Sequence, residues 1–203
     1  MSNIKICGIT NKEDAQVAVE AGADALGFIF YERSPRYVTP DTVRAITSAI
    51  PPFVTTVGVF VNTPADKVNE VARSCGLHAV QLHGDESPDY CDQIEGSIIK
   101  AVRVKDDSFQ TVIGPYRVQA VLLDTYAPDK YGGTGKTFDW SLIKQQRSYR
   151  IILSGGLTPE NVAEAIRFVQ PYAVDTGSGV EATPGRKDHD KVWAFIDAAR
   201  RYK

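Results

Sequence analysis

The residues of this chain best suited to proton transfer are a cysteine and an aspartate, each at the end of an apolar run. Cys7 follows IKI in the segment IKICGIT, and Asp124 follows AVLL. A thiol near a helix N-terminus and near Lys5 can have a lowered pKa and supply thiolate. A buried carboxylic acid can have a raised pKa, which suits a general acid. We expect Cys7 and Asp124 to transfer protons; the structural alternatives are an inert buried thiol and a loop-capping carboxylate.

Two glycine-rich segments, LSGGLTPENV and DTGSGVE, could bind an anion. Each places glycines directly after an expected strand, and the residues concerned are Ser154, Gly155, Gly156, Asp175, Gly177, Ser178 and Gly179. Backbone N–H groups beside glycine can approach a phosphate closely, and the first segment leads into a helix N-terminus. Either segment alone is also typical of a turn. Together they predict a site for a phosphorylated small molecule.

Three further polar side chains follow expected strands. Arg36 in ERSPRYV is either a solvated surface residue or a clamp for a second anion such as a carboxylate. Gln81 and His83 end the run HAVQLH, and His83 is as consistent with a packed or loop-capping role as with a catalytic one. We group Arg36, Gln81, His83 and Lys5 with the substrate-binding residues.

Neither a metal nor a nucleotide cofactor is indicated. No group of histidines, cysteines and carboxylates has zinc spacing. The string GTGKT resembles a nucleotide-binding loop, but the motif requires glycine at position 130, which is Lys130. We interpret the surrounding segment TYAPDKYGGTGKTFDW as a mobile flap over the site. The expected chemistry therefore uses no cofactor.

The elements that must position these residues are short β-rich runs that alternate with segments of helical period. There are eight runs, at 3–9, 25–30, 55–61, 78–83, 97–104, 120–125, 149–154 and 172–177. Most are too continuously apolar for a sheet with one wet face. The helical segments carry start signals: a hydroxyl N-cap followed by proline at Thr39-Pro40, Thr63-Pro64, Ser87-Pro88 and Thr158-Pro159, and a capping box of Thr10 with Glu13.

Eight such units in 203 residues predict a (β/α)8 TIM barrel, with residues 1–203 forming a single domain. An open doubly wound sheet is the alternative, but CGITNKED lacks the G-x-G-x-x-G turn, and eight parallel strands are many for an open sheet. In a barrel, the chemistry lies in the loops after the strand carboxyl ends, where these candidate residues are found.

Composition excludes several other classes. The charged fraction of 24% and the net charge of −2 provide no basic excess for nucleic acid or a membrane surface. Three cysteines cannot form a closed disulfide set, and no secretory signal precedes the first strand, so we expect a cytoplasmic protein. No apolar stretch approaches the ~20 residues that span a bilayer. A barrel enzyme that isomerises a phosphorylated small molecule is the physical interpretation.

Several motifs then occur together in one order: KICGIT, SPRYV, GVFVN, QLHGDE, LLD with GGTGK, LSGGLTPENV, and DTGSGVE with PGRKD. Over nearly the whole chain, they resemble the phosphoribosylanthranilate isomerase family of tryptophan biosynthesis. The resemblance implies a cofactor-free Amadori rearrangement of N-(5'-phosphoribosyl)anthranilate to the 1-deoxyribulose 5-phosphate derivative.

The resemblance also implies roles for individual residues. Asp124 would be the general acid that protonates the furanose ring oxygen, and Cys7 the general base that takes the C2' proton. Arg36 would pair with the anthranilate carboxylate, and the two glycine segments would hold the phosphate. The family often has two serines where this chain has Gly177 and Ser178, so one hydroxyl donor to the phosphate is missing in this chain.

Other functions remain as alternatives. Another sugar-phosphate isomerase or epimerase could use the same barrel, because fold does not fix function. An Amadori enzyme acting on a histidine precursor is expected to use two aspartates, so Cys7 argues against it. A non-catalytic phosphometabolite-binding protein or thiol redox sensor would need the glycine segments but not Asp124. The sequence is compatible with a monomer and with a homodimer.

Overall fold

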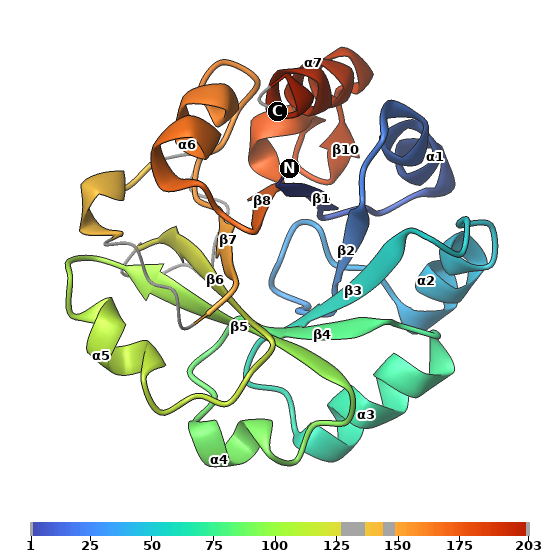
Figure 1. Ribbon diagram of the computed structural model, residues 1–203. Helices are drawn as coiled ribbons and strands as arrows, with labels where there is room; N and C mark the ends of the chain where they lie inside the picture. Colours follow the sequence, from blue (N-terminus) through green and yellow to red (C-terminus); the bar gives the residue numbers. More distant parts are fainter. Residues whose placement is uncertain (1, 127–136, 144–148, 202–203) are drawn as a thin grey trace.

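The computed structural model describes residues 2–126, 137–143 and 149–201, and it forms a closed barrel of eight parallel strands (Figure 1). The strands are β1 (Asn3–Cys7), β2 (Ala25–Ile29), β3 (Thr55–Phe60), β4 (Ala79–Leu82), β5 (Ser97–Val104), β6 (Ala120–Thr125), β7 (Ile151–Leu153) and β8 (Ala173–Thr176). β1 pairs directly with β8, with Lys5 opposite Asp175, and this pairing closes the barrel. The predicted TIM barrel is confirmed, and the open-sheet alternative is wrong.

Helices surround the barrel, in the connections between its strands and after the last of them (Figure 1). They are α1 (Lys12–Ala21), α2 (Pro40–Thr47), α3 (Ala65–Ser74), α4 (Pro88–Cys91), α5 (Phe109–Ile113), α6 (Val162–Val169) and α7 (His189–Arg200). Between β6 and β7 the described residues form the 3-10 helix η1 (Trp140–Leu142). Most of the expected flap, residues 127–136, lies outside the described residues. None of the described helices has the length and apolar character that crossing a membrane requires.

Two of the five predicted helix starts are confirmed. The side chains of Thr39 and Ser87 accept the N–H groups of Thr42 and Tyr90, with proline in the first turn of α2 and α4.

The other three predicted starts are wrong. Asn11 caps α1, because the Thr10 hydroxyl donates instead to the Gly185 carbonyl at 2.5 Å. α3 begins after Pro64 without a side-chain cap. α6 begins at Val162, because the Asn161 side chain turns back to the Thr158 N–H at 2.8 Å and holds a turn there.

Alternation along each strand separates two apolar layers. The outward residues of β1 and β2, such as Ile6 and Phe28, are fully buried in one cluster with residues of the helices. The inward residues form a separate interior cluster of mainly small and aliphatic side chains: Ala101, Ala120, Leu122, Ile152 and Ala173, with Ile99 packed against them. Toward the carboxyl ends of the strands, the inward positions carry polar instead of apolar residues. On β6, for example, Asp124 comes two residues after Leu122. The inward polar residues therefore lie above an apolar interior layer.

One feature of the fold was not predicted. After β8 the chain forms the 3-10 helix η2 (Ser178–Val180), then β9 (Glu181–Thr183) paired antiparallel with β10 (Arg186–Lys187). This small hairpin lies against the first strand-to-helix loop and the first turn of α1, since Gly185 accepts from Thr10 and the Lys187 N–H donates to Asp14. It brings charged residues of the C-terminal part close to the end of β1.

Candidate active site

Cys7 lies on the inner face of the barrel with a buried lysine beside it. Lys5 Nζ donates to Asp175 Oδ1 at 2.8 Å, and Ser154 Oγ donates to Asp175 Oδ2 at 3.2 Å. Gly27, opposite Cys7 in the register of β2, makes room for both groups: a side chain there would begin 2.7 Å from Cys7 Sγ and 3.1 Å from Lys5 Nζ. The structure thus brings together Cys7 and Lys5, which the sequence places on one strand face, with Ser154 and Asp175 of the two glycine-rich segments.

The electrostatic expectation for Cys7 is wrong in its net direction. Burial raises the pKa of the thiol, the Lys5 ammonium lowers it, the Asp175 carboxylate raises it, and the Lys187 ammonium lowers it. The net pKa of Cys7 lies above the ordinary value of a thiol, because a nearly enclosed thiolate loses its hydration. Burial likewise lowers the pKa of Lys5, but the Asp175 carboxylate and Cys7 outweigh that effect and raise it. Lys5 therefore opposes the effect of burial on the thiol without reversing it.

Asp124 ends a chain of three polar side chains inside the barrel. Its Oδ1 accepts the N–H of Thr125 at 2.8 Å, and its Oδ2 lies 3.2 Å from His83 Nε2. His83 Nδ1 lies 2.8 Å from Gln81 Nε2 on the same strand end. Asp124 and Gln81 are both buried. His83 is therefore a neighbour of the expected acid rather than a loop cap.

The two glycine segments lie against each other at the ends of β7 and β8. Thr176 Oγ1 donates to the Leu157 carbonyl at 2.8 Å, and a side chain on Gly179 would collide with the same carbonyl. Gly155 has a positive φ of 83°, and a side chain there would meet Thr125 and Asp124 Oδ1. Glycine is required at these positions for close backbone approach. The segments and Asp124 therefore share one end of the barrel.

Arg36 lies at this end but is not a solvated surface residue. Its Nε and Nη2 donate to the two carboxylate oxygens of Glu181 at 2.7 and 2.6 Å. The hydrogen bonds to Glu181 raise the pKa of the guanidinium, against the lowering effect of burial. Gly8 makes room for the arginine, since a side chain there would begin 2.8 Å from Arg36 Cδ. Fork pairing of this kind fixes the orientation of the planar group.

Sequence reasoning missed three residues that shape the site: Gly27, Glu181 and Lys187. Lys187 Nζ is buried and donates to the carbonyls of Cys7 and Gly177 at 2.7 and 2.9 Å, and to Glu181 at 3.2 Å. It thereby ties the end of β1 to the end of β8. The motifs DTGSGVE and PGRKD contain Glu181 and Lys187, but nothing in them indicated a contact with a residue about 180 positions away. The pairing of Gly27 with Cys7 could have been found from the parallel register of the first two strands.

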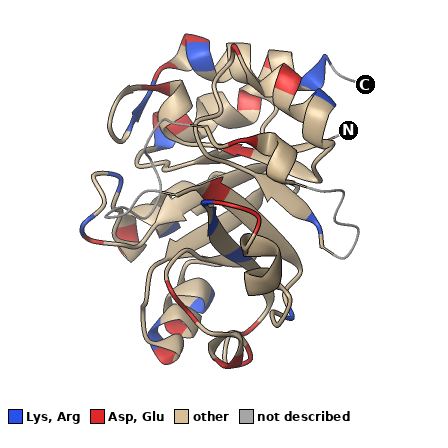
Figure 2. Ribbon diagram, turned by 90° about the vertical axis from the view of Figure 1, so that its left-hand side faces the viewer, with Lys and Arg blue, Asp and Glu red and all other residues tan. Residues whose placement is uncertain are grey.

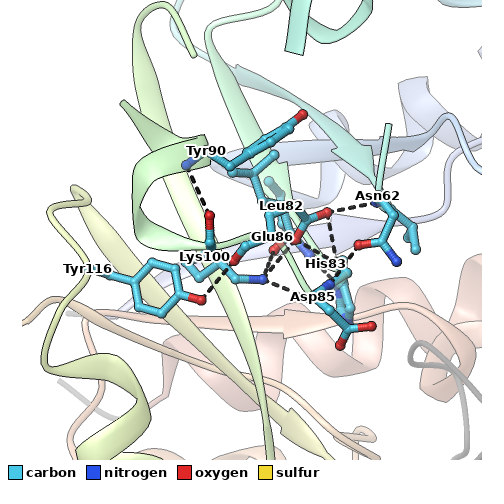
Figure 3. Close-up of polar contacts among 12 residues, drawn as sticks. Asn62, Leu82, His83, Asp85, Glu86, Tyr90, Lys100 and Tyr116 are labelled. Carbon is cyan, nitrogen blue, oxygen red and sulfur yellow. Dashed lines mark hydrogen bonds and ion pairs between the residues drawn. The ribbon is translucent and has the colours of Figure 1, made fainter. Parts of the chain in front are cut away.

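Behind His83 lies a second polar group, on the outer side of the barrel (Figure 3). Lys100 Nζ donates to Glu86 Oε2 at 2.9 Å and to the carbonyls of Gly84 and Leu82 at 2.8 and 3.3 Å. Glu86 also accepts the N–H groups of Asn62 and Gly84. These contacts fix the loop that follows β4, and with it the backbone of His83.

The charged residues over the rest of the described chain form no basic surface that would attract an anionic substrate. Figure 2 shows acidic and basic residues interspersed over the helices and loops of the described chain. With a net charge of −2, the attraction of an anionic substrate has to come from local groups at the barrel mouth.

Comparison with known proteins is consistent with this geometry. Residues 4–198 match the family model described as N-(5'phosphoribosyl)anthranilate (PRA) isomerase. The chain is 56% identical over 202 residues to the N-(5'-phosphoribosyl)anthranilate isomerase of Trichlorobacter lovleyi, covering 98% of each chain.

Two solved structures are similar over 99% of this chain and all of theirs. One is a phosphoribosylanthranilate isomerase in complex with reduced 1-(o-carboxyphenylamino)-1-deoxyribulose 5-phosphate, with TM-score 0.89 and 46% identity. The other shows monomers generated from the dimeric isomerase of Thermotoga maritima, with TM-score 0.90 and 47% identity.

Proposed function

The chain belongs to the N-(5'-phosphoribosyl)anthranilate isomerase family, and from this premise we propose that it isomerises N-(5'-phosphoribosyl)anthranilate to 1-(o-carboxyphenylamino)-1-deoxyribulose 5-phosphate in tryptophan biosynthesis. The observation that carries the proposal is the placement of Cys7 and Asp124 on inward faces at the same end of the barrel, where the glycine segments also meet. A base, an acid and a phosphate site are the three parts that this rearrangement needs.

Asp124 acts first, as the general acid. Its proton goes to the furanose ring oxygen, the bond from that oxygen to C1' breaks, and the anilino nitrogen forms a protonated Schiff base with C1'. The Thr125 N–H and the imidazole of His83 contact the two oxygens of Asp124, so that the carboxyl group is held in one orientation.

Cys7 acts second, as the general base. The thiolate takes the C2' proton, the electrons of that C–H bond form the C1'–C2' double bond, and the positive Schiff base nitrogen becomes neutral. The resulting enol then becomes the 2-ketone by proton transfer to C1', so the reaction has no net gain or loss of protons. Lys5 supports the thiolate by its charge, because it lowers the pKa that burial raises.

Binding of the substrate uses the remaining predicted residues. Gly155, Gly156, Ser178 and Gly179 offer backbone N–H groups to the phosphate, and Gly177 has no hydroxyl to add. Arg36 holds the anthranilate carboxylate, with Glu181 fixing its orientation through Nε and Nη2. Gln81 and His83 lie close enough to Asp124 to contribute to the floor of the site.

The test compares cysteine and aspartate variants with a matched control. Substrate fluorescence is expected to disappear with wild-type protein, and turnover to fall at least ~10²-fold in Cys7→Ala and in Asp124→Asn, in line with the usual contribution of one proton transfer. Cys91→Ala removes a buried thiol in α4 and is expected to keep wild-type turnover. Complementation of a tryptophan auxotroph tests the same activity in cells. Wild-type rates in both Cys7→Ala and Asp124→Asn would disprove the assigned base and acid.

We further propose that residues 1–203 form one catalytic domain that works in the cytoplasm without a cofactor. The three cysteines are free thiols, which fits a reducing compartment. A homodimer is proposed by analogy with the dimeric relative from Thermotoga maritima. Sedimentation equilibrium of the purified protein tests the oligomeric state.

A further inference from the structure

The hydrogen-bonded chain from Gln81 through His83 to Asp124 contains an asymmetry. Gln81 Nε2 contacts His83 Nδ1, while Gln81 Oε1 is buried and has no hydrogen-bond partner among the described residues. A 180° turn of the amide exchanges the two atoms and places Oε1 against Nδ1. Since Oε1 has no other bond to lose, the turn exchanges one hydrogen bond for another.

In the first arrangement the amide N–H donates to His83 Nδ1. A neutral imidazole with an accepting Nδ1 carries its proton on Nε2 and donates it to Asp124 Oδ2. The Thr125 N–H already donates to Oδ1, so both oxygens of Asp124 accept. This arrangement suits a carboxylate, which is the form of the acid after it has given up its proton.

In the second arrangement Gln81 Oε1 accepts a proton from His83 Nδ1. The bare Nε2 then faces Asp124 Oδ2, and one added proton binds between the two atoms, either as an O–H that donates to Nε2 or as an N–H that donates to the carboxylate. Thr125 still donates to Oδ1. This arrangement keeps one added proton in the Asp124–His83 pair, and the first step of the proposed reaction consumes that proton.

We propose that Gln81 and His83 are positioning residues that keep the proton of the general acid in the Asp124–His83 pair through the Nδ1–H tautomer of His83, with the Gln81 amide turning between a donated and an accepted hydrogen bond to Nδ1. The proposal rests on the proposed function, in which Asp124 is the general acid. The two arrangements differ by one proton, which water supplies: in the second, His83 Nδ1 carries a proton, and a further proton lies between His83 Nε2 and Asp124 Oδ2. No other group has to change its protonation.

The first test reads the tautomer directly by ¹⁵N NMR of histidine-labelled protein. The chain has three histidines, and His78 is an internal reference because its Nδ1 accepts the Thr56 N–H at 3.0 Å. Asp124→Asn keeps an oxygen for Thr125 and places an N–H donor against His83 Nε2. We expect His83 to move to the Nδ1–H tautomer in this variant while His78 stays unchanged. An Nε2–H tautomer of His83 in Asp124→Asn would overturn the coupling.

The second test addresses Gln81 with Gln81→Glu, whose carboxylate can only accept. We expect His83 Nδ1 to carry a proton throughout, and kcat to fall about ten- to a hundredfold with KM close to wild type, less than the ~10²–10⁴-fold of a whole proton transfer. Gln119→Glu is the matched control, because the Gln119 side-chain oxygen accepts the Ile98 N–H at 2.7 Å and a carboxylate keeps that bond. An unprotonated Nδ1, or wild-type kcat, in Gln81→Glu would overturn the role of Gln81.

These tests separate the inference from the proposed function. The tautomer of His83 in Asp124→Asn is measured without substrate. The result therefore does not depend on whether the wild-type protein isomerises phosphoribosylanthranilate. Failure of the wild-type assay with the expected tautomer switch would refute the assigned reaction alone. A working isomerase without the switch would refute this inference alone.

Discussion

Two buried lysine–carboxylate pairs lie on opposite sides of the barrel wall, and they differ in what surrounds them. Lys5 and Asp175 lie 2.8 Å apart on the inner face, and Lys100 and Glu86 lie 2.9 Å apart on the outer face. Lys100 also donates to two backbone carbonyls, whereas Lys5 lies beside Cys7. The outer pair uses its hydrogen bonds to hold the backbone, whereas the inner pair keeps a positive charge next to the thiol of Cys7.

The difference in neighbouring groups explains how two equally buried lysines can have different roles. A buried ion pair is weak evidence for stability, because desolvation offsets much of the attraction. Its purpose has to be inferred from the neighbours of the charged atoms. The Glu86 carboxylate is hydrogen-bonded to backbone N–H groups of two loops, whereas the Asp175 carboxylate is hydrogen-bonded to Ser154 and Lys5 at the candidate site.

The largest expected effect is the loss of stability when the outer pair is broken. Lys100→Met leaves the Glu86 carboxylate buried without its cation, which typically costs about 3–5 kcal/mol of unfolding free energy. Urea denaturation measures this loss, and kcat of the folded protein is expected to change less than in Lys5→Met. A loss below about 1 kcal/mol would show that the outer pair does not hold the backbone of the loop after β4.

The next effect is on turnover, at the inner pair. Lys5→Met removes the cation beside Cys7, and we expect kcat to fall by about ten- to a hundredfold, part of the contribution of a general base. Steady-state kinetics on folded protein, confirmed by circular dichroism, measures it. Equal kcat values for Lys5→Met and Lys100→Met would remove the functional distinction between the two pairs.

The two pairs also mark what the sequence can and cannot reveal. The β-rich runs and turn signals are local, so the eight strands could be predicted within a few residues and Lys5 placed on the face of Cys7. The burial of Lys100, in β5, could not be predicted, because it depends on Glu86 in the loop that follows β4. The contact of Lys187 with the Cys7 carbonyl joins residues near the two ends of the chain and left no local signal.

The electrostatics of Cys7 were the least predictable part of the site. Lys5 was foreseen as its neighbour, whereas Gly27 and Lys187 were not, and the sign of the net effect on the pKa depends on how completely the barrel encloses the sulfur. Burial outweighs the lysine, and only the packed structure supplies that comparison. The ion pair of Arg36 could not be predicted from the sequence either, because its partner Glu181 lies 145 positions away.

A smaller effect is expected on the reactivity of the thiol. Burial raises the pKa of Cys7 and Lys5 lowers it, so Lys5→Met raises it further and reduces the thiolate fraction at a given pH. Alkylation of Cys7, followed by mass spectrometry as a function of pH, should slow by about tenfold for each unit of added pKa. The two rates should converge well above both pKa values. An unchanged pH profile would show that Lys5 does not act on the thiol by its charge.

The smallest effect sharpens the comparison by adding a third pair with the same separation. Lys67 and Glu70 lie 2.9 Å apart on α3, but their side chains are 54% and 64% exposed. Solvent screens their attraction, so Lys67→Gln is expected to change the unfolding free energy by no more than about 0.5 kcal/mol and to leave kcat unchanged. Urea denaturation beside Lys100→Met makes the contrast direct. If both variants lose equal stability, the separation of the charged atoms alone would govern the energy, and burial and neighbouring groups would not distinguish the pairs.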